Sequence, residues 1–286
     1  AIDHLSSLSR IFALDRGHAL LVGVKSSGRK SLARLALHMA SFDTFEIAIT
    51  RTYGFNEWRD DLKNLFKQCG ELDTPTGFII TDVQIIMPQQ LEDLSNLLIN
   101  CIIPHLYARE EIDQIRVDMS QNVEINNDGS DLFELFMNRV KKNLHVILVF
   151  SPFGSVFKDA MLSYPALRSE TTIDWYMPWS QDALESVGSA SLKKVENLKS
   201  IVSVCVNIHK SVEKFADKFL KDTKRFTAIT PSRYFELLTT FNNKLNKKQL
   251  ENEELINKYS NGVDQILTTR KQIDEMSKQL NTDIPI

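Results

Sequence analysis

Residues 18–31 read HALLVGVKSSGRKS, and this stretch decides the fold. An apolar run, His18–Val22, predicts a buried strand, and residues 29–39 (RKSLARLALHM) predict a helix. Between them Gly23 and Gly28 have the spacing of the phosphate-binding pattern G-x-x-x-x-G-K-S/T. The free N–H groups and the positive dipole end of a helix start can hold phosphate oxygens there. We therefore predict a nucleotide-binding loop, called the phosphate loop below, made of Gly23, Val24, Lys25, Ser26, Ser27, Gly28, Arg29, Lys30 and Ser31.

The two cationic residues of the phosphate loop leave its register open. If the glycines fix the register, Arg29 stands at the position of the phosphate-binding lysine, and Lys30 at that of the magnesium-binding hydroxyl. A shift of one residue returns Lys30 and Ser31 to those two roles but gives up the glycine spacing. We prefer the glycine-fixed register, and Ser31 stays a magnesium candidate only in the shifted one.

Composition limits the class of protein. The chain has 286 residues, which suits one α/β unit with an appendage or two small domains. Its net charge of −3 argues against nucleic acid as a bulk electrostatic partner. Cys69, Cys101 and Cys205 lie far apart, so we expect buried thiols rather than disulfides or zinc ligands. No apolar run approaches the roughly 18 residues that span a bilayer, so no membrane partner is expected. The first residue is Ala1, and we expect a piece of a longer polypeptide.

Short apolar runs alternate with amphipathic segments up to residue 176. The expected strands are 18–22, 45–49, 77–81, 145–151 and 171–176, and the expected helices between them include 56–69, 89–100 and 131–143. This alternation predicts an α/β fold with a parallel sheet covered by helices on both faces. Asn56 and Asp131 are the expected N-caps of their helices. The polar, weakly periodic stretch 107–130 is expected to be an exposed loop.

The pattern changes after Pro178. Residues 180–223 predict helices, and Thr230-Pro231 predicts the start of another. From there, spacings of three and four residues continue for roughly six heptads, which is typical of a coiled-coil strand. We favour a coiled coil over a long helix packed on its own domain, because no turn signal interrupts the pattern before Asn281. The seam consists of Phe235, Leu238, Asn242, Leu245, Gln249, Asn252, Ile256, Tyr259, Val263, Ile266, Arg270, Ile273, Ser277 and Leu280.

Other candidate site residues stand at the ends of elements. In GFIITD the strand ends at Asp82, which suits the magnesium-side carboxylate of an ATPase, although a turn cap is the alternative. Val83 follows, and a valine cannot accept a proton or orient water. Ser151, at the end of the 145–151 strand, can sense a terminal phosphate or simply form a turn. Arg233 can reach a phosphate from the helical part or be a solvated arginine.

The remaining aromatic and imidazole residues indicate packing rather than chemistry. Trp58, Trp175 and Trp179 are expected to anchor the core. The histidines show no metal-ligand spacing, and no Ser-His-Asp or Cys-His arrangement stands out.

Taken in order, the segments RGHALLVG, YGFNEWRDDLKNLFKQCG, GFIITDVQI, LEDLSNLLIN, NRVKKNLHVILVFSP, PALRSETTIDWYMPW and ITPSRYFELL resemble the fourth AAA+ module of a dynein heavy chain, of the axonemal type. The resemblance covers nearly the whole chain. It implies a P-loop AAA+ large subdomain over 1–176, a small helical subdomain over 177–234 and the first strand of the coiled-coil stalk over 235–286. It also implies that residues 23–31 and Asp82 hold the nucleotide, with Ser151 and Arg233 as sensors.

The departures from this family pattern concern hydrolysis. Ser26 stands at a glycine position of the loop, Val83 at that of the catalytic glutamate, and Ser232 at that of an arginine that comes one step later as Arg233. Glu170 stands where an active relative offers an arginine finger, and Arg168 is displaced from it. Each departure weakens hydrolysis more than binding.

The resemblance implies ATP or ADP as cofactor, with Mg²⁺ at Asp82 and Ser31 as a possibility. It also implies neighbouring AAA+ modules, a microtubule reached through the stalk tip, and dynein intermediate and light chains as partners. The implied location is the cytoplasm and cytoskeleton, in the axoneme of a cilium or flagellum. We expect a module that binds nucleotide with weak or absent hydrolysis. The alternatives are an active ATPase that uses Lys30 and Ser31, and a nucleotide-free structural module.

Overall fold

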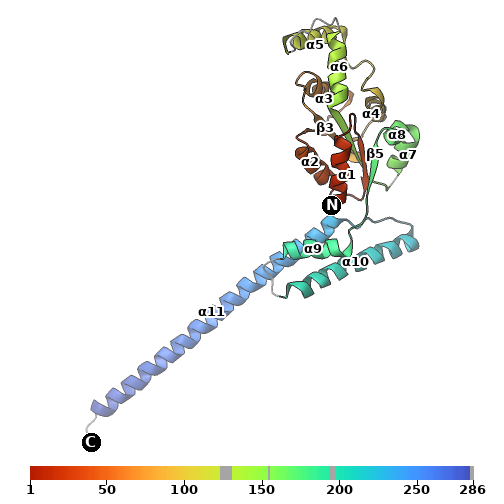
Figure 1. The fold of residues 1–286 in the computed structure, drawn as a ribbon. Coiled ribbons are helices and arrows are strands. Elements are labelled where there is room, and N and C mark those ends of the chain that lie inside the picture. The colour runs from red at the N-terminus through yellow and green to blue at the C-terminus, as the bar shows by residue number, and fades with distance from the viewer. Residues whose placement is uncertain (123–130, 154, 193–196, 284–286) are drawn as a thin grey trace. The chain divides into compact units, whose positions relative to one another are not determined.

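The structure is a computed structural model that describes residues 1–122, 131–153, 155–192 and 197–283 (Figure 1). The chain divides into two compact units, Ala1–Trp179 and Ser180–Ile286, which are described separately. The predicted subdomain boundaries at 176 and 234 stay predictions. None of the described helices is both long enough and apolar enough to cross a membrane.

The described part of the first unit contains a parallel sheet of five strands. They are β1 Ala19–Gly23, β2 Asp43–Glu46, β3 Thr76–Thr81, β4 Leu144–Phe150 and β5 Thr172–Tyr176, in the spatial order β2-β3-β4-β1-β5. All residues of the central strands β1 and β4 are buried, as the continuous apolar runs predict. The predicted α/β fold with a parallel sheet is confirmed.

Helices cover both faces of this sheet (Figure 1). One face packs against α1 Ile2–Phe12 and α2 Arg29–Met39, and the other against α3 Phe55–Gly70, α4 Pro88–Asn100 and α6 Leu132–Asn143. Three further helices, α5 Arg109–Asn122, α7 Ser155–Ser163 and α8 Ala166–Ser169, and the short 3₁₀ helix Asp82–Gln84 complete the described elements of the unit. Because the strands are parallel, the carboxyl ends of β1, β3 and β4 meet at one edge of the sheet.

Two predicted segments are wrong in type or extent. Strand β2 covers 43–46 rather than 45–49, because the Gln84 side-chain amide donates a hydrogen bond to the Ile47 carbonyl (2.6 Å), which ends the pairing at this edge strand. The expected loop 107–130 contains the helix α5, whose Ile115 and Met119 are buried four residues apart. The four apolar residues of this helix, Ile112, Ile115, Val117 and Met119, follow spacings of three, two and two, which do not form a clear helical period. Residues 123–130 of that stretch lie outside the described residues.

Two predicted local roles are also wrong, and two others are confirmed. The helix α3 begins after Gly54, not Asn56, and the Gly54 N–H donates to Glu57 Oε2 (3.0 Å). Trp175 is 52% exposed, because it lies on the edge strand β5, whereas Trp58 is fully buried. Asp131 does cap α6, since its carboxylate accepts the Phe133 N–H (3.1 Å). The cysteines are buried free thiols, as expected.

The second unit contains the helices α9 Gln181–Ser191, α10 Leu198–Thr223 and α11 Pro231–Asp283. The fully buried Tyr234 joins them: its hydroxyl donates to the Leu184 carbonyl (3.0 Å), and its ring lies 5.3 Å from that of His209. Helix α11 begins at Pro231, as predicted, and continues without a break through the heptad seam.

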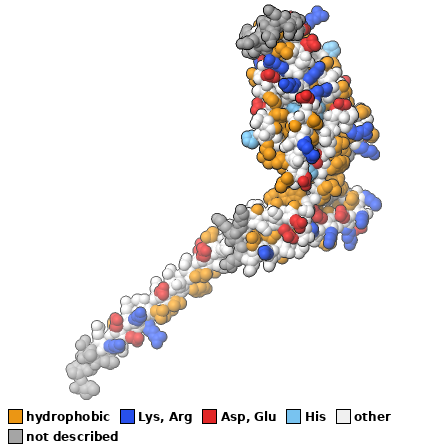
Figure 2. All heavy atoms as spheres, viewed as in Figure 1, with side chains coloured by type: hydrophobic (Ala, Val, Ile, Leu, Met, Phe, Trp, Pro, Cys, Tyr) orange, Lys and Arg blue, Asp and Glu red, His pale blue; other side chains and the backbone are white. Residues whose placement is uncertain are grey.

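The seam of α11 changes character along its length. Leu238 is buried within the second unit, whereas Ile256, Tyr259, Val263, Ile266 and Ile273 are exposed. Figure 2 shows apolar side chains along this helix. The single long helix is confirmed, and its pairing with a second helix stays a prediction. The side chain of Leu280 lies outside the described residues.

Candidate functional site

The phosphate loop joins the end of β1 to the start of α2. Gly28 is the N-cap of α2 and has a φ of +92°, in the left-handed region that favours glycine. Ser26, at the position where the family pattern has a further glycine, also has a positive φ of +62°. The loop therefore keeps a backbone shape that glycine favours, although a serine now adopts part of it.

Gly23 is required by the close approach of β5. Gly23 lies opposite Tyr176 in the parallel pairing of β1 and β5. A Cβ atom at residue 23 would stand 2.7 Å from Tyr176 Cβ and 2.9 Å from the Tyr176 carbonyl oxygen. A larger residue at this position must therefore displace the backbone of the neighbouring strand.

A buried hydroxyl in the phosphate loop lacks a partner. Ser27 is only 8% exposed, and its Oγ makes no hydrogen bond to the described residues. The Tyr176 hydroxyl, beside the loop, is buried and unpaired in the same sense. Buried polar atoms without partners are rare in folded proteins. Ser27 Oγ and the free N–H groups at the start of α2 together fit an anion that supplies the missing acceptors.

Arg29, the first residue of α2, points inward. It is 6% exposed, and its Nη1 donates a hydrogen bond to the Phe150 carbonyl at the end of β4. Burial lowers the pKa of the Arg29 guanidinium, while the nearby Asp82 and Tyr176 act in the opposite direction. A guanidinium remains charged even with a lowered pKa. The site therefore contains a buried permanent cation.

Lys30 points elsewhere. Its Nζ lies 2.7 Å from Glu46 Oε2, and Arg34 binds the same carboxylate through two hydrogen bonds of 2.7 and 2.8 Å. These contacts lower the pKa of Glu46 against the opposing effect of its burial. The Lys30 ammonium is thus held by an acidic partner on β2, whereas Arg29 is held by a carbonyl.

Asp82 follows β3 directly and is tied to β4. Its Oδ2 accepts the Ser151 backbone N–H at 3.0 Å. Phe150 and Ser151 share one peptide group, so Arg29 binds its carbonyl and Asp82 binds its N–H. The structure brings together the phosphate loop, Asp82 and Ser151, as the sequence predicts, but Ser151 binds Asp82 through its backbone N–H. Val83 is 64% exposed and offers no acid or base.

The residues present do not fit a magnesium ion. Magnesium in phosphate sites takes oxygen ligands, here expected from a loop hydroxyl and a strand-end carboxylate. Lys30 occupies the hydroxyl position and is a donor without acceptor capacity. Ser31, the other candidate, is exposed on α2, and one oxygen of Asp82 already accepts a hydrogen bond. Among the described residues no group of acidic, histidine and cysteine side chains forms a metal site.

Arg233 belongs to the second unit. It lies in the first turn of α11, where its Nη1 is 2.8 Å from Glu236 Oε2 and its side chain is largely exposed. Its approach to a nucleotide therefore stays a prediction. Glu170 follows α8, and its Oε1 accepts the Ser169 hydroxyl (3.2 Å).

Three groups that shape the site have no signal in the sequence motif. Tyr176 leaves no room for a Cβ atom at Gly23. The Phe150 carbonyl accepts a hydrogen bond from Arg29, and Glu46 forms an ion pair with Lys30. All three come from other strands of the sheet, β5, β4 and β2, so only the strand order could have placed them beside the loop. A sequence pattern read along one segment does not contain that order.

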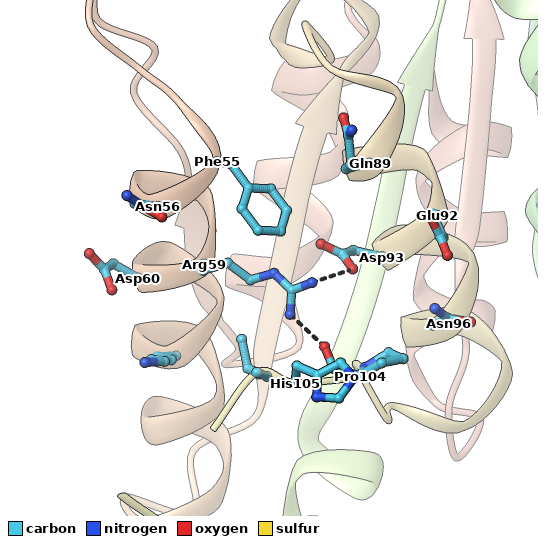
Figure 3. A pocket seen from close by; sticks show the side chains of 12 residues that line it. Phe55, Asn56, Arg59, Asp60, Gln89, Glu92, Asp93, Asn96, Pro104 and His105 are labelled. Atoms are coloured by element: carbon cyan, nitrogen blue, oxygen red, sulfur yellow. Dashed lines mark hydrogen bonds and ion pairs between the residues drawn. The ribbon is translucent and has the colours of Figure 1, made fainter. Parts of the chain in front are cut away.

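A hollow lies between α3 and α4, and none of the phosphate-loop residues lines it (Figure 3). It has a volume of about 600 Å³. At its base Arg59 Nη2 lies 3.3 Å from Asp93 Oδ1, Arg59 Nη1 donates to the Pro104 carbonyl (2.9 Å), and the Phe55 ring lies 4.8 Å from the guanidinium. Trp58 Nε1 donates to Asp93 Oδ2 (2.9 Å). These contacts join α3 to α4, and we assign them a structural role.

Comparison with known proteins agrees with this geometry. A family model described as the P-loop containing dynein motor region D4 matches residues 1–244. The chain is 35% identical, over its whole length, to dynein axonemal heavy chain 1 of Homo sapiens. It is 37% identical over 98% of its length to dynein axonemal heavy chain 2 of Homo sapiens, and 35% identical over 97% to the dynein-1-beta heavy chain, flagellar inner arm I1 complex, of Chlamydomonas reinhardtii.

The chain spans only 7%, 6% and 6% of the length of these three relatives. The predicted resemblance to axonemal dynein heavy chains is confirmed. Since the family model covers most of the sequence, this chain belongs to the P-loop containing dynein motor region D4 family.

Proposed function

We propose that this chain is a nucleotide-binding module of an axonemal dynein motor, and that it holds ATP or ADP with weak or absent hydrolysis. The observation that carries the proposal is the phosphate loop itself. The loop ends at the start of α2 and contains the Ser27 hydroxyl, which is buried without a partner. Its residue Arg29 is a buried cation. A loop with no anion to hold has no evident use for this combination.

The residues of the loop have separate roles in this proposal. The N–H groups at the start of α2 and Ser27 Oγ hold phosphate oxygens, and Arg29 supplies the positive charge. Gly23 and Gly28 give the backbone its shape. Asp82 and the Ser151 N–H fix the ends of β3 and β4 against each other. Arg233 is a further candidate contact from the helical unit.

The same residues argue against efficient hydrolysis. The position of the catalytic glutamate is Val83, Lys30 is paired with Glu46, and the position of the arginine finger is Glu170. We therefore infer a regulatory and structural role in a ring of modules. The partners that we propose are the neighbouring AAA+ modules of the same heavy chain, the microtubule reached through the stalk, and the intermediate and light chains of the complex. The proposed location is the axoneme of a cilium or flagellum.

Helix α11 is proposed as the first helix of an antiparallel coiled-coil stalk. Its exposed apolar residues need a partner helix, since a long helix gains most of its stability from packing such a stripe. The first half of the seam contains Asn242, Gln249 and Asn252, and polar seams of this kind specify register less tightly. Sliding between two registers would then transmit a signal along the stalk.

Locking this stalk in one register is expected to change microtubule affinity. A cysteine at Tyr259, paired by a disulfide with a cysteine on the second stalk helix of the heavy chain, fixes one register, and a partner cysteine one turn away fixes the other. We expect the two locked forms to differ at least about fivefold in microtubule affinity, the usual scale of allosteric coupling. Cosedimentation with microtubules measures the difference, with the reduced protein as control. Equal affinities would make the stalk a passive spacer.

The register of the phosphate loop predicts unequal effects of two charge removals. We expect Arg29→Met to weaken binding of a fluorescent ADP analogue by at least about tenfold, because charge-assisted contacts are worth about 1.5–3 kcal/mol. Lys30→Met is expected to have a clearly smaller effect, because Glu46 already holds Lys30. Fluorescence anisotropy gives both dissociation constants.

Arg34→Met is the matched control for this comparison, since Arg34 also pairs with Glu46 but lies one turn further along α2. Dominance of Lys30 would support the shifted register and an active ATPase. Absence of binding in the unmodified chain would support the nucleotide-free alternative.

A further inference from the structure

The cation expected at an ATPase phosphate site is already part of this protein. We propose that the Arg29 guanidinium takes the place of a magnesium ion, so that this module binds its nucleotide without Mg²⁺. The inference rests on the proposed function and concerns the ion requirement of the same site.

The first support is the position of Arg29 relative to β4. The side chain is almost completely buried and donates to the Phe150 carbonyl. The next N–H along the chain, that of Ser151, donates to Asp82 Oδ2 at 3.0 Å. One peptide group therefore holds Arg29 at its oxygen and Asp82 at its nitrogen. In the strand order β4 lies between β3, which Asp82 follows, and β1, which leads into Arg29.

The second support is the local charge. Asp82 is the carboxylate that would face a metal, and Arg29 lies near enough to feel its charge. The two charges cancel, so an incoming divalent cation meets no net negative site and is repelled by the guanidinium. Magnesium also gives up its water reluctantly and needs near-octahedral oxygen ligands. A buried site with a fixed guanidinium offers neither room for the retained waters nor a set of octahedral oxygen ligands.

The third support is the residue at the loop position where a magnesium-binding serine or threonine is expected. Lys30 stands there and is held at 2.7 Å from Glu46 on β2. It adds a positive charge where a metal ligand is required. A phosphate group, by contrast, is well matched by a guanidinium, which is planar, always charged and weakly hydrated. The altered loop thus loses a metal site but keeps an anion site.

Binding of a fluorescent ADP analogue to the 286-residue chain, with Mg²⁺ and with excess EDTA, tests this inference. We expect dissociation constants that agree within about threefold, or tighter binding in EDTA, because no metal ligand is lost when the ion is removed. Binding that weakens more than about threefold in EDTA would overturn the inference and leave the proposed function intact. No binding in either condition would overturn the proposed function itself.

Two variants sharpen the result. Asp82→Asn keeps an oxygen for the Ser151 N–H and removes a negative charge, so we expect tighter binding in both conditions. At a magnesium site the same change would weaken binding in Mg²⁺, and that outcome contradicts the inference. Arg34→Met, with the same loss of charge as Arg29→Met but outside the loop, controls for general electrostatics. Circular dichroism confirms that each variant is folded.

Discussion

ATP turnover by this chain is expected to lie between about 0.1 and 0.001 s⁻¹. A typical enzyme turns over about 10 times per second, and loss of a general base lowers the rate by about 10²–10⁴. Val83 is an exposed aliphatic residue in the position where the general base belongs, directly after Asp82. Lys30 stands in place of the magnesium-binding hydroxyl and Glu170 in place of the arginine finger, so two further contributions to the rate are missing. We therefore expect a value at the lower end of the range.

A coupled assay for released phosphate, run on the 286-residue chain, measures this rate. Because traces of contaminating ATPase can produce such low values, Arg29→Met, which is expected to weaken nucleotide binding, serves as control: a rate at low ATP that this variant leaves unchanged does not come from this site. Val83→Glu alone is expected to leave the rate low, since Lys30 remains paired with Glu46. A rate of about 1 s⁻¹, in the range of working enzymes, that disappears in Lys30→Ala would contradict the proposal. It would establish the shifted register instead.

Asp93→Ala is expected to lower the free energy of unfolding of the first unit by about 3–5 kcal/mol, the usual result of breaking a buried ion pair. The side chains of Arg59 and Asp93 are 18% and 5% exposed. Asp93 accepts from Trp58 Nε1 and from Arg59, so the substitution leaves the Arg59 guanidinium without its counter-charge and the indole N–H without its acceptor. Burial raises the pKa of the Asp93 carboxyl, whereas Trp58 and Arg59 act to lower it.

Urea unfolding, followed by hydrogen exchange of the β3 amides, measures the loss within the first unit. Asp113→Ala is the matched control: Asp113 pairs with Arg116 at 3.0 Å, but the two side chains are 73% and 42% exposed. Such surface pairs contribute about 1 kcal/mol or less. The double variant Asp93→Leu with Arg59→Met should recover most of the stability, because no charge is then left buried. A small effect of Asp93→Ala, equal to the surface control, would show that water reaches this pair.

The hollow above this pair illustrates how volume and function can diverge. It measures about 600 Å³ and opens between α3 and α4 (Figure 3). The Arg59 guanidinium in this hollow already binds Asp93 and the Pro104 carbonyl. The phosphate loop, by contrast, contains the buried Ser27 Oγ, which makes no hydrogen bond to the described residues. The candidate site is therefore placed by the phosphate-loop motif at a helix start, rather than by the volume of a hollow.

The sequence by itself determined the elements whose signal is local. Continuous apolar runs identify the central strands β1, β3 and β4, because strands buried on both faces need no polar side. The glycines and the following amphipathic run identify the phosphate loop and α2. Threonine followed by proline marks the start of α11, and the heptad spacing marks its length. In each case the cause lies within a few neighbouring residues.

The elements that the sequence mispredicted depend on distant partners. The helix α5 exists because Ile115 and Met119 reach the core, although most of its other residues are polar. Strand β2 ends early because Gln84, far along the chain, takes the Ile47 carbonyl. Trp175 is exposed because β5 happens to be an edge strand. None of these causes is visible from the residues next to them.

The same division applies within the candidate site. The motif alone placed a glycine-rich loop and two cationic residues at a helix start, but it left the roles of Arg29 and Lys30 open. Tertiary structure separated them: Arg29 is held by β4 and Lys30 by β2. Adjacent side chains on a helix point about 100° apart, so each meets whichever strand lies in its direction. Sequence sets which charges are present, and the order of the strands, which is a property of the whole chain, decides which of them turns into the site.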